Sequence, residues 1–134
     1  LPVEVAYTKT YTEFQESFDG FWGDVSVGAE LPYIPESMLS VNLGVNMSKT
    51  SVNVGLKHTS AMRTKAGSGQ LDDANSTDAL TLVDLGVKHS LQNNLTLSMG
   101  VKNLLDKDAI VARRPYGARP TMPRSISLGV SYNF

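Results

Sequence analysis

The chain has no cysteine, and this absence excludes disulfide bonds and thiolate metal sites. Long apolar runs are also missing, because no run approaches the roughly 18 residues of a membrane-spanning helix. A helical membrane protein is therefore excluded. A barrel that crosses a membrane with strands remains open, because alternating strands never form long apolar runs.

Charge is sparse and nearly balanced, since 19% of the 134 residues are charged and the formal net charge is −1. This balance excludes a general attraction to nucleic acid or acidic lipid. The distribution is uneven, because residues 1–36 hold seven carboxylates and one lysine, whereas residues 113–124 hold four arginines and no carboxylate. The sequence therefore predicts one basic segment near its C-terminal end.

What the sequence does contain is alternation of apolar and polar residues, the period of a strand with one apolar face. One face of residues 125–134 carries only apolar or aromatic side chains, namely Ile126, Leu128, Val130, Tyr132 and Phe134. Five further segments alternate in the same way: residues 1–10, 39–48, 51–57, 83–88 and 95–102. No window has a helical period, so the sequence predicts an all-β fold of about six strands.

The connections between these segments alternate between long and short. Residues 47–50 and 91–94 are tight, as hairpin turns are, whereas residues 15–36, 64–77 and 103–123 form long links. An antiparallel up-and-down meander with short turns at one end and long loops at the other produces this order. Outer-membrane barrels have that asymmetry. The alternative is a soluble β-sandwich with uneven loops.

The composition of the two faces of the predicted strands favours a membrane barrel over a soluble sheet. The polar face is mainly Ser, Thr, Asn and Gly, whereas a soluble sheet usually carries more lysine and glutamate. Aromatic residues lie near the strand ends of the apolar face, as an interfacial girdle requires: Tyr7, Tyr11, Tyr132 and Phe134. We expect the apolar face to meet lipid and the polar face to meet water or another protein element.

Six strands cannot close a membrane barrel, since the smallest known barrels have about eight. An open sheet in lipid would leave edge N–H and C=O groups unsatisfied, at a cost of several kcal/mol for each group. We therefore expect the chain either to be a piece of a larger barrel or to pair its edges with copies of itself. The first residue is not methionine, which favours the first of these alternatives, a piece of a larger barrel.

Three stretches resemble the C-terminal barrel of TonB-dependent outer-membrane receptors, particularly the ferric-citrate and siderophore types. They are "ELPYIPESMLSVNLGV" at residues 30–45, "MRTKAGSGQ" at residues 62–70 and the final stretch at residues 101–134. The final stretch contains Asn103-Leu104-Leu105-Asp106-Lys107, then Pro123-Arg124, then a strand that ends in an aromatic residue. This is the usual order in the family, although the family more often has phenylalanine at the position of Leu105.

The resemblance implies the C-terminal part of a roughly 22-stranded transmembrane β-barrel, in the outer membrane of a Gram-negative bacterium. It implies a transporter of an iron chelate that is energised through TonB and is not an enzyme, with no cofactor. The implied partners are outer-membrane lipid, the barrel-assembly machinery, and the plug domain and other strands that residues 1–134 lack. The resemblance also implies that the assembly machinery reads the apolar residues of the last strand, from Ile126 to Phe134.

The basic segment holds the candidate ligand-binding residues, which are Arg113, Arg114 and Arg119, with Arg124 beside them. Three prolines stiffen it, namely Pro115, Pro120 and Pro123. Pre-ordered guanidinium groups suit carboxylates or the anion of a ferric chelate. Alternatively, the arginines pair with acids of neighbouring loops or contact lipopolysaccharide phosphates. Nucleic-acid binding is not predicted, because Tyr116 is the only aromatic residue here.

Catalytic and metal sites are not predicted. His58 and His89 each end an alternating segment without the neighbouring ligands that a metal site needs, and we expect an interfacial position for His58. Residues 71–78 hold acids without the register of a calcium loop, and "GSGQ" at residues 67–70 lacks the context of a phosphate loop.

Two other functions stay open beside the receptor. A soluble β-sheet binding module would share the alternation, and a small self-assembling pore would satisfy its strand edges by pairing copies of the chain.

Overall fold

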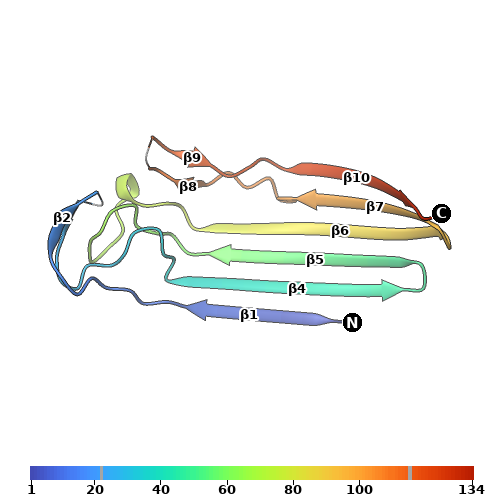
Figure 1. Ribbon diagram of the computed structural model, residues 1–134, viewed down its shortest axis with the longest axis horizontal. Helices are drawn as coiled ribbons and strands as arrows, with labels where there is room; N and C mark the ends of the chain where they lie inside the picture. Colours follow the sequence, from blue (N-terminus) through green and yellow to red (C-terminus); the bar gives the residue numbers. More distant parts are fainter. Residues whose placement is uncertain (22, 115) are drawn as a thin grey trace.

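The computed structural model describes residues 1–21, 23–114 and 116–134. It consists of one six-stranded antiparallel sheet in which β1, β4, β5, β6, β7 and β10 lie side by side in that order. The strands span Val3–Lys9 (β1), Ser37–Met47 (β4), Thr50–Thr59 (β5), Leu80–Gln92 (β6), Leu95–Lys102 (β7) and Ser125–Tyr132 (β10). The predicted all-β meander of six strands is confirmed, with short turns at one end of the sheet and long loops at the other (Figure 1).

The long loops contain short elements that the alternation did not predict. Two small hairpins are formed by β2 (Phe18–Gly20) with β3 (Gly23–Val25) and by β8 (Ile110–Ala112) with β9 (Arg119–Pro120). One turn of 3-10 helix covers Asp73–Asn75. These pieces are too short for a period to be recognised. Among the described residues, no helix is long and apolar enough to cross a membrane.

The strand register joins the apolar positions into continuous rows across the sheet. One row contains Val3, Leu43, Val54, Leu85, Val101 and Ile126, one residue from each strand. The polar positions form rows of their own, such as Gly44, Asn53, Gly86, Gly100 and Ser127. The alternation therefore produces one apolar face and one polar face over the whole sheet.

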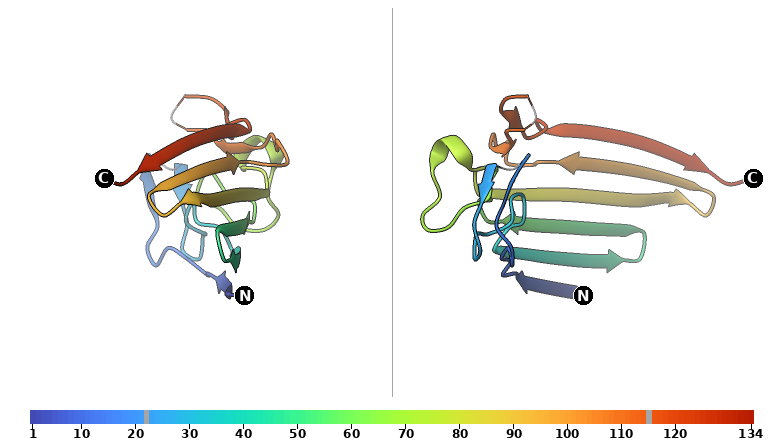
Figure 2. Two further views of the ribbon diagram at one scale, coloured as in Figure 1. Left: turned by 90° about the vertical axis from the view of Figure 1, so that its right-hand side faces the viewer. Right: turned by 60° about the vertical axis from the view of Figure 1, so that its left-hand side comes forward.

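The sheet is a single twisted layer, and no second layer of the described chain covers its strands (Figure 2). Apolar side chains on β10 are accordingly exposed, with 81% of Leu128 and 72% of Val130 accessible. Domains in water normally bury an apolar face between two packed layers. Among the described residues, no second layer packs on this face of the sheet.

The packed part of the chain lies in and beside the long loops. The described residues that are buried are mostly loop residues: Val25, Ala29, Thr64, Ser76, Thr77, Asn103 and Thr121, together with Gly44 in β4 and Val101 near the loop end of β7. Most of them are polar, so hydrogen bonds rather than apolar contacts order this end of the molecule.

Candidate functional site

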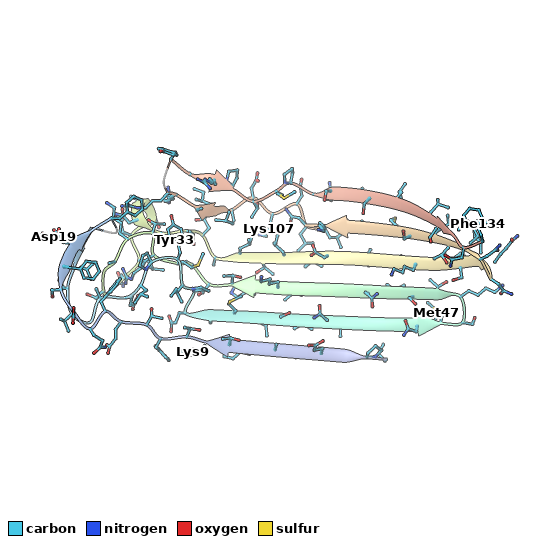
Figure 3. The ribbon with its side chains drawn as sticks, viewed as in Figure 1. Lys9, Asp19, Tyr33, Met47, Lys107 and Phe134 are labelled. Carbon is cyan, nitrogen blue, oxygen red and sulfur yellow. The ribbon has the colours of Figure 1, made fainter. Side chains whose placement is uncertain are left out.

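Three loops meet at one end of the sheet, and we name them by their order: the first loop (residues 10–36), the second loop (60–79) and the third loop (103–124). They connect β1 to β4, β5 to β6 and β7 to β10 (Figure 1). Tyr33 lies among these loops, whereas Met47 and Phe134 lie at the opposite end of the sheet (Figure 3). The loop end therefore gathers the candidate ligand-binding residues.

The base of the third loop is closed by the side chain of Asn103, which is 4% exposed. Its Nδ2 donates to the carbonyl oxygens of Lys107 at 3.1 Å and Met122 at 2.9 Å, and its Oδ1 accepts from the N–H of Lys107 at 2.9 Å. Asn103 has a positive φ of 51°, a conformation that asparagine tolerates better than most residues. One side chain thus holds both ends of the third loop together.

Further hydrogen bonds, made by Asp106 of the Asn-Leu-Leu-Asp-Lys motif and by residues packed against the motif, also close the base of the third loop. Asp84 on β6 accepts from the N–H of Asn103 at 3.0 Å, and Asp106 accepts from the N–H of Arg124 at 2.8 Å. Thr121 donates its hydroxyl to the carbonyl of Lys107 at 2.7 Å. The sequence indicated this motif only through a family resemblance. Its structural role here is to fix the start of β10 beside the end of β7.

Within the basic segment, Arg113 and Arg114 face the other two loops. Nε of Arg113 donates to the carbonyl of Ser76 at 2.6 Å, and Nη1 of Arg114 lies 3.4 Å from the carbonyl of Phe21. The hydroxyl oxygen of Tyr33 accepts from the backbone N–H groups of both arginines, at 3.3 and 3.0 Å. The structure therefore joins Arg113 and Arg114 to the rest of the loop end.

The other residues of the basic segment lie in different surroundings. Arg119 begins β9 and is exposed, and Arg124 is held at the base of the loop by Asp106. Pro115 lies outside the described residues. In the described part of the chain, the ion pairs join Lys9 to Glu36 and Arg63 to Glu30, and none involves these four arginines. The guanidinium groups of Arg113 and Arg114 are therefore held by carbonyl oxygens rather than by carboxylates.

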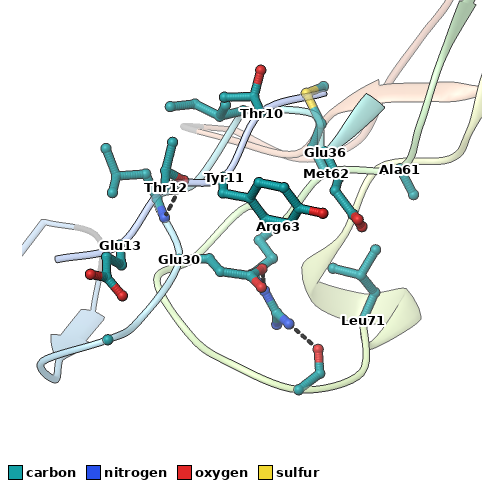
Figure 4. Close-up of a pocket in the computed structure, with 14 residues that line it drawn as sticks. Thr10, Tyr11, Thr12, Glu13, Glu30, Glu36, Ala61, Met62, Arg63 and Leu71 are labelled. Atoms are coloured by element: carbon teal, nitrogen blue, oxygen red, sulfur yellow. Dashed lines mark hydrogen bonds and ion pairs between the residues drawn. The ribbon is translucent and has the colours of Figure 1, made fainter. Parts of the chain in front are cut away.

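A cavity of about 540 Å³ opens between the first and second loops (Figure 4). Nε of Arg63 lies 2.6 Å from a carboxylate oxygen of Glu30, and its Nη2 donates to the carbonyl of Gly69. The lining also includes Glu13 and Glu36, so its carboxylates outnumber its single guanidinium. This excess makes the cavity a poor site for an anion and directs an anionic ligand toward the third loop.

A second cavity, of about 370 Å³, lies on the polar face over β6, β7 and β10. Its lining includes three glycines, namely Gly86, Gly100 and Gly129. A Cβ atom at Gly129 would lie 2.6 Å from Oγ of Ser98, so a side chain cannot replace this hydrogen without a shift of Ser98. Because these glycines have no side chains, they leave open space over the polar face at the β10 side of the sheet.

The two histidines lie at opposite ends of the β5–β6 pair. Nδ1 of His58 is 2.8 Å from Oγ1 of Thr81, and Nδ1 of His89 is 2.8 Å from Oγ1 of Thr50. Both pairs lie on the apolar face. In the register, the His58–Thr81 pair lies in a row with Leu39, and the His89–Thr50 pair lies in a row with Leu97. The interfacial position of His58 stays a prediction, to which its cross-strand contact with Thr81 is well suited.

β10 carries the predicted assembly signal on an open edge of the sheet. Ile126 is 67% exposed and Tyr132 is 53% exposed, on the same face as Leu128 and Val130. The rings of Tyr132 and Phe134 meet edge to face, with 5.4 Å between their centroids. The strand thus presents a continuous apolar stripe that ends in an aromatic pair.

No family model matches the sequence, and no curated protein matches it significantly. Solved structures do match it. The closed form of the ferric-catecholate import receptor Fiu from Escherichia coli K12 has a TM-score of 0.76 and 23% identity, over 98% of this chain and 19% of the receptor. Its open form has a TM-score of 0.67 and 22% identity, over 80% of this chain and 18% of that one. The siderophore receptor PiuA from Acinetobacter baumannii has a TM-score of 0.76 and 16% identity, over 97% and 19% of the two chains.

These similarities concern the fold. The chain adopts the strand arrangement of part of these receptors, so the resemblance to siderophore receptors is confirmed at that level. The chain spans about a fifth of the length of the structures that it matches, since it covers 19% of Fiu and of PiuA.

Proposed function

We propose that the chain is the C-terminal portion of an outer-membrane receptor that transports an anionic iron chelate. The observation that carries the proposal is the single-layer sheet, which has one apolar face that no second layer covers and the strand arrangement of part of Fiu and PiuA. In this proposal the complete protein is a barrel of about 22 strands in the outer membrane of a Gram-negative bacterium.

Each exposed surface of the sheet requires a different partner. The apolar face suits lipid, because moving one leucine or valine side chain from water to an apolar medium contributes about 1.5–3 kcal/mol. The open edges of β1 and β10 suit the remaining barrel strands, because unpaired edge groups cannot stay in lipid. The polar face suits the plug domain, which in the family couples transport to the TonB system.

The ligand is proposed from the charge of the loop end. The third loop holds the basic segment, whereas the cavity between the first and second loops is acidic. We therefore assign the contact with an anionic chelate to Arg114 and Arg119. We include Arg113 among the ligand-binding residues because it adjoins Arg114. A ferric catecholate, which is the ligand class named for Fiu, carries several negative charges and fits this assignment.

Replacing Arg114 or Arg119 by glutamate in the full-length receptor should weaken binding of iron(III) tris-catecholate about three- to tenfold each at low ionic strength. The loss should shrink as salt screens the exposed charges. Quenching of intrinsic fluorescence measures the affinity. Lys49→Glu is the matched control, because it makes the same charge change at the turn end of the sheet. Equal affinities for all three variants, at normal surface expression, would contradict the arginine assignment.

Expression of residues 1–134 without detergent separates the receptor from a soluble binding module. We expect aggregation that detergent prevents, because the apolar rows of the sheet have no partner in water. Size-exclusion chromatography and thermal melting measure the outcome. A monodisperse monomer that melts cooperatively would contradict the membrane assignment, and ring-shaped oligomers in detergent would favour the self-assembling pore.

A further inference from the structure

The three loops are connected in every pairwise combination. The first and second loops share an isolated β-bridge between Glu30 and Gly67, in addition to the Arg63–Glu30 ion pair. The second and third loops are joined by Asp78, whose carboxylate accepts from the N–H of Ile110 at 2.7 Å. The first and third loops meet at Tyr33, whose hydroxyl oxygen accepts from two N–H groups of the third loop, and at Phe21, whose carbonyl lies near Arg114.

Tyr33 has an unusual backbone and two contacts through its hydroxyl oxygen. Its φ is +59°, which is uncommon for a residue other than glycine, asparagine or aspartate. Its N–H donates to the carbonyl of Arg63 at 2.7 Å, which fixes the backbone on the second loop. From there the ring reaches the third loop, where the oxygen accepts from the N–H groups of Arg113 and Arg114.

We propose that Tyr33 is a positioning residue that holds the Arg113–Arg114 peptide of the third loop and thereby directs the guanidinium group of Arg114. The N–H groups of two successive peptide bonds, Ala112–Arg113 and Arg113–Arg114, donate to one oxygen and so define the position of this stretch of backbone. With the peptide held, Nε of Arg113 reaches the carbonyl of Ser76, and the side chain of Arg114 lies toward Phe21 of the first loop.

The proposal rests on the proposed function where it concerns the ligand, but not where it concerns the loop. An arginine that must meet an anion gains from being held in place beforehand, because less conformational freedom is lost on binding. Removing the Tyr33 oxygen should therefore loosen the tip of the third loop first and weaken ligand binding as a consequence.

Limited trypsin digestion of the full-length receptor carrying Tyr33→Phe tests the loop directly. Trypsin cleaves after arginine but resists a following proline, so the Arg114–Pro115 and Arg119–Pro120 bonds are protected by sequence. The Arg113–Arg114 bond is open to trypsin, and its own N–H is the one bound by Tyr33 at 3.0 Å. We expect cleavage there to become about tenfold faster, because local opening becomes easier when both hydrogen bonds are lost.

Two references make this result specific. Arg124 donates its N–H to Asp106 and Ser125 begins β10, so cleavage of the Arg124–Ser125 bond should not depend on Tyr33 and its rate should not change. Tyr116→Phe removes the same atom from a residue of the third loop that is 88% exposed, and it should leave both rates unchanged. General destabilisation would instead accelerate both cleavages, which would overturn the proposal, as would an unchanged rate at Arg113–Arg114.

Affinity for iron(III) tris-catecholate is measured on the same variants. A several-fold loss in Tyr33→Phe, together with a loss in Arg114→Glu, supports the full proposal. A loss in Arg114→Glu alone would overturn the role of Tyr33 in directing Arg114. Faster cleavage with no loss in either variant would support the hold of Tyr33 on the loop and would contradict the proposed ligand contact instead.

Discussion

Insertion of one residue after Gly129 is expected to abolish assembly of the full-length receptor into the outer membrane. The insertion moves Val130, Tyr132 and Phe134 to the polar face and brings Ser131 and Asn133 to the face that we assign to lipid. It also breaks the registered pairs Val130–Leu97 and Tyr132–Leu95. Outer-membrane yield of heat-modifiable receptor measures the effect.

Two further variants distinguish the effect of moving side chains to the other face from the effect of changing the length of β10. Insertion of two residues after Gly129 changes the length but restores the alternation, so the yield should recover in part. Deletion of Phe134 keeps the faces and removes one aromatic group of the Tyr132–Phe134 pair, so assembly should fall while inserted molecules still transport. A normal yield from the one-residue insertion would show that this face does not meet lipid.

Replacing Asn103 by alanine is expected to lower the free energy of unfolding by about 3–5 kcal/mol. The change removes three hydrogen bonds of a buried side chain and leaves the backbone groups of Lys107 and Met122 without these partners. Alanine is also strained at the positive φ of Asn103, whereas glycine is not. Asn103→Gly should therefore cost about 1 kcal/mol less than Asn103→Ala.

Urea unfolding of the purified receptor in detergent micelles measures these differences. Asn46→Ala is the matched control, because Asn46 is exposed near the turn end of β4 and should change stability by less than about 0.5 kcal/mol. A loss of stability in Asn46→Ala that equals the loss in Asn103→Ala would mean that the closure of the third loop does not stabilise the barrel.

The sheet could be predicted from the sequence because its signal repeats every two residues. All six strands and the assignment of residues to two faces follow from alternation alone, and the register confirms that apolar positions align from β1 to β10. The predicted strand at residues 83–88 was too short, since β6 spans Leu80–Gln92. Its ends place Thr81 and His89 at positions of the apolar face and Leu82 at a position of the polar face, opposite Lys57, so the alternation fails at the ends of the strand.

The loop end could be predicted only in part. The basic segment was visible as a run of arginines, but Tyr33 and Asn103 act through contacts with residues far away in the sequence, such as Arg114 and Met122. No local pattern reports such contacts. Arg63 was part of a stretch with family resemblance, yet its ion pair with Glu30 depends on how two loops pack together.

We predict that His58 lies at one border of the apolar band, and the His89–Thr50 pair at the other end of the β5–β6 pair then gives a height for that band. Eight residue steps separate Thr50 from His58 on β5, which is about 26 Å along the strand. A tilt of about 40° reduces the hydrophobic height to about 20 Å. This is well below the average bilayer core of about 30 Å and agrees in direction with the thinner outer membrane. A bilayer with a thicker hydrocarbon core would draw His58 or His89 below the headgroups, so hydrophobic mismatch would select the membrane in which this sheet is stable.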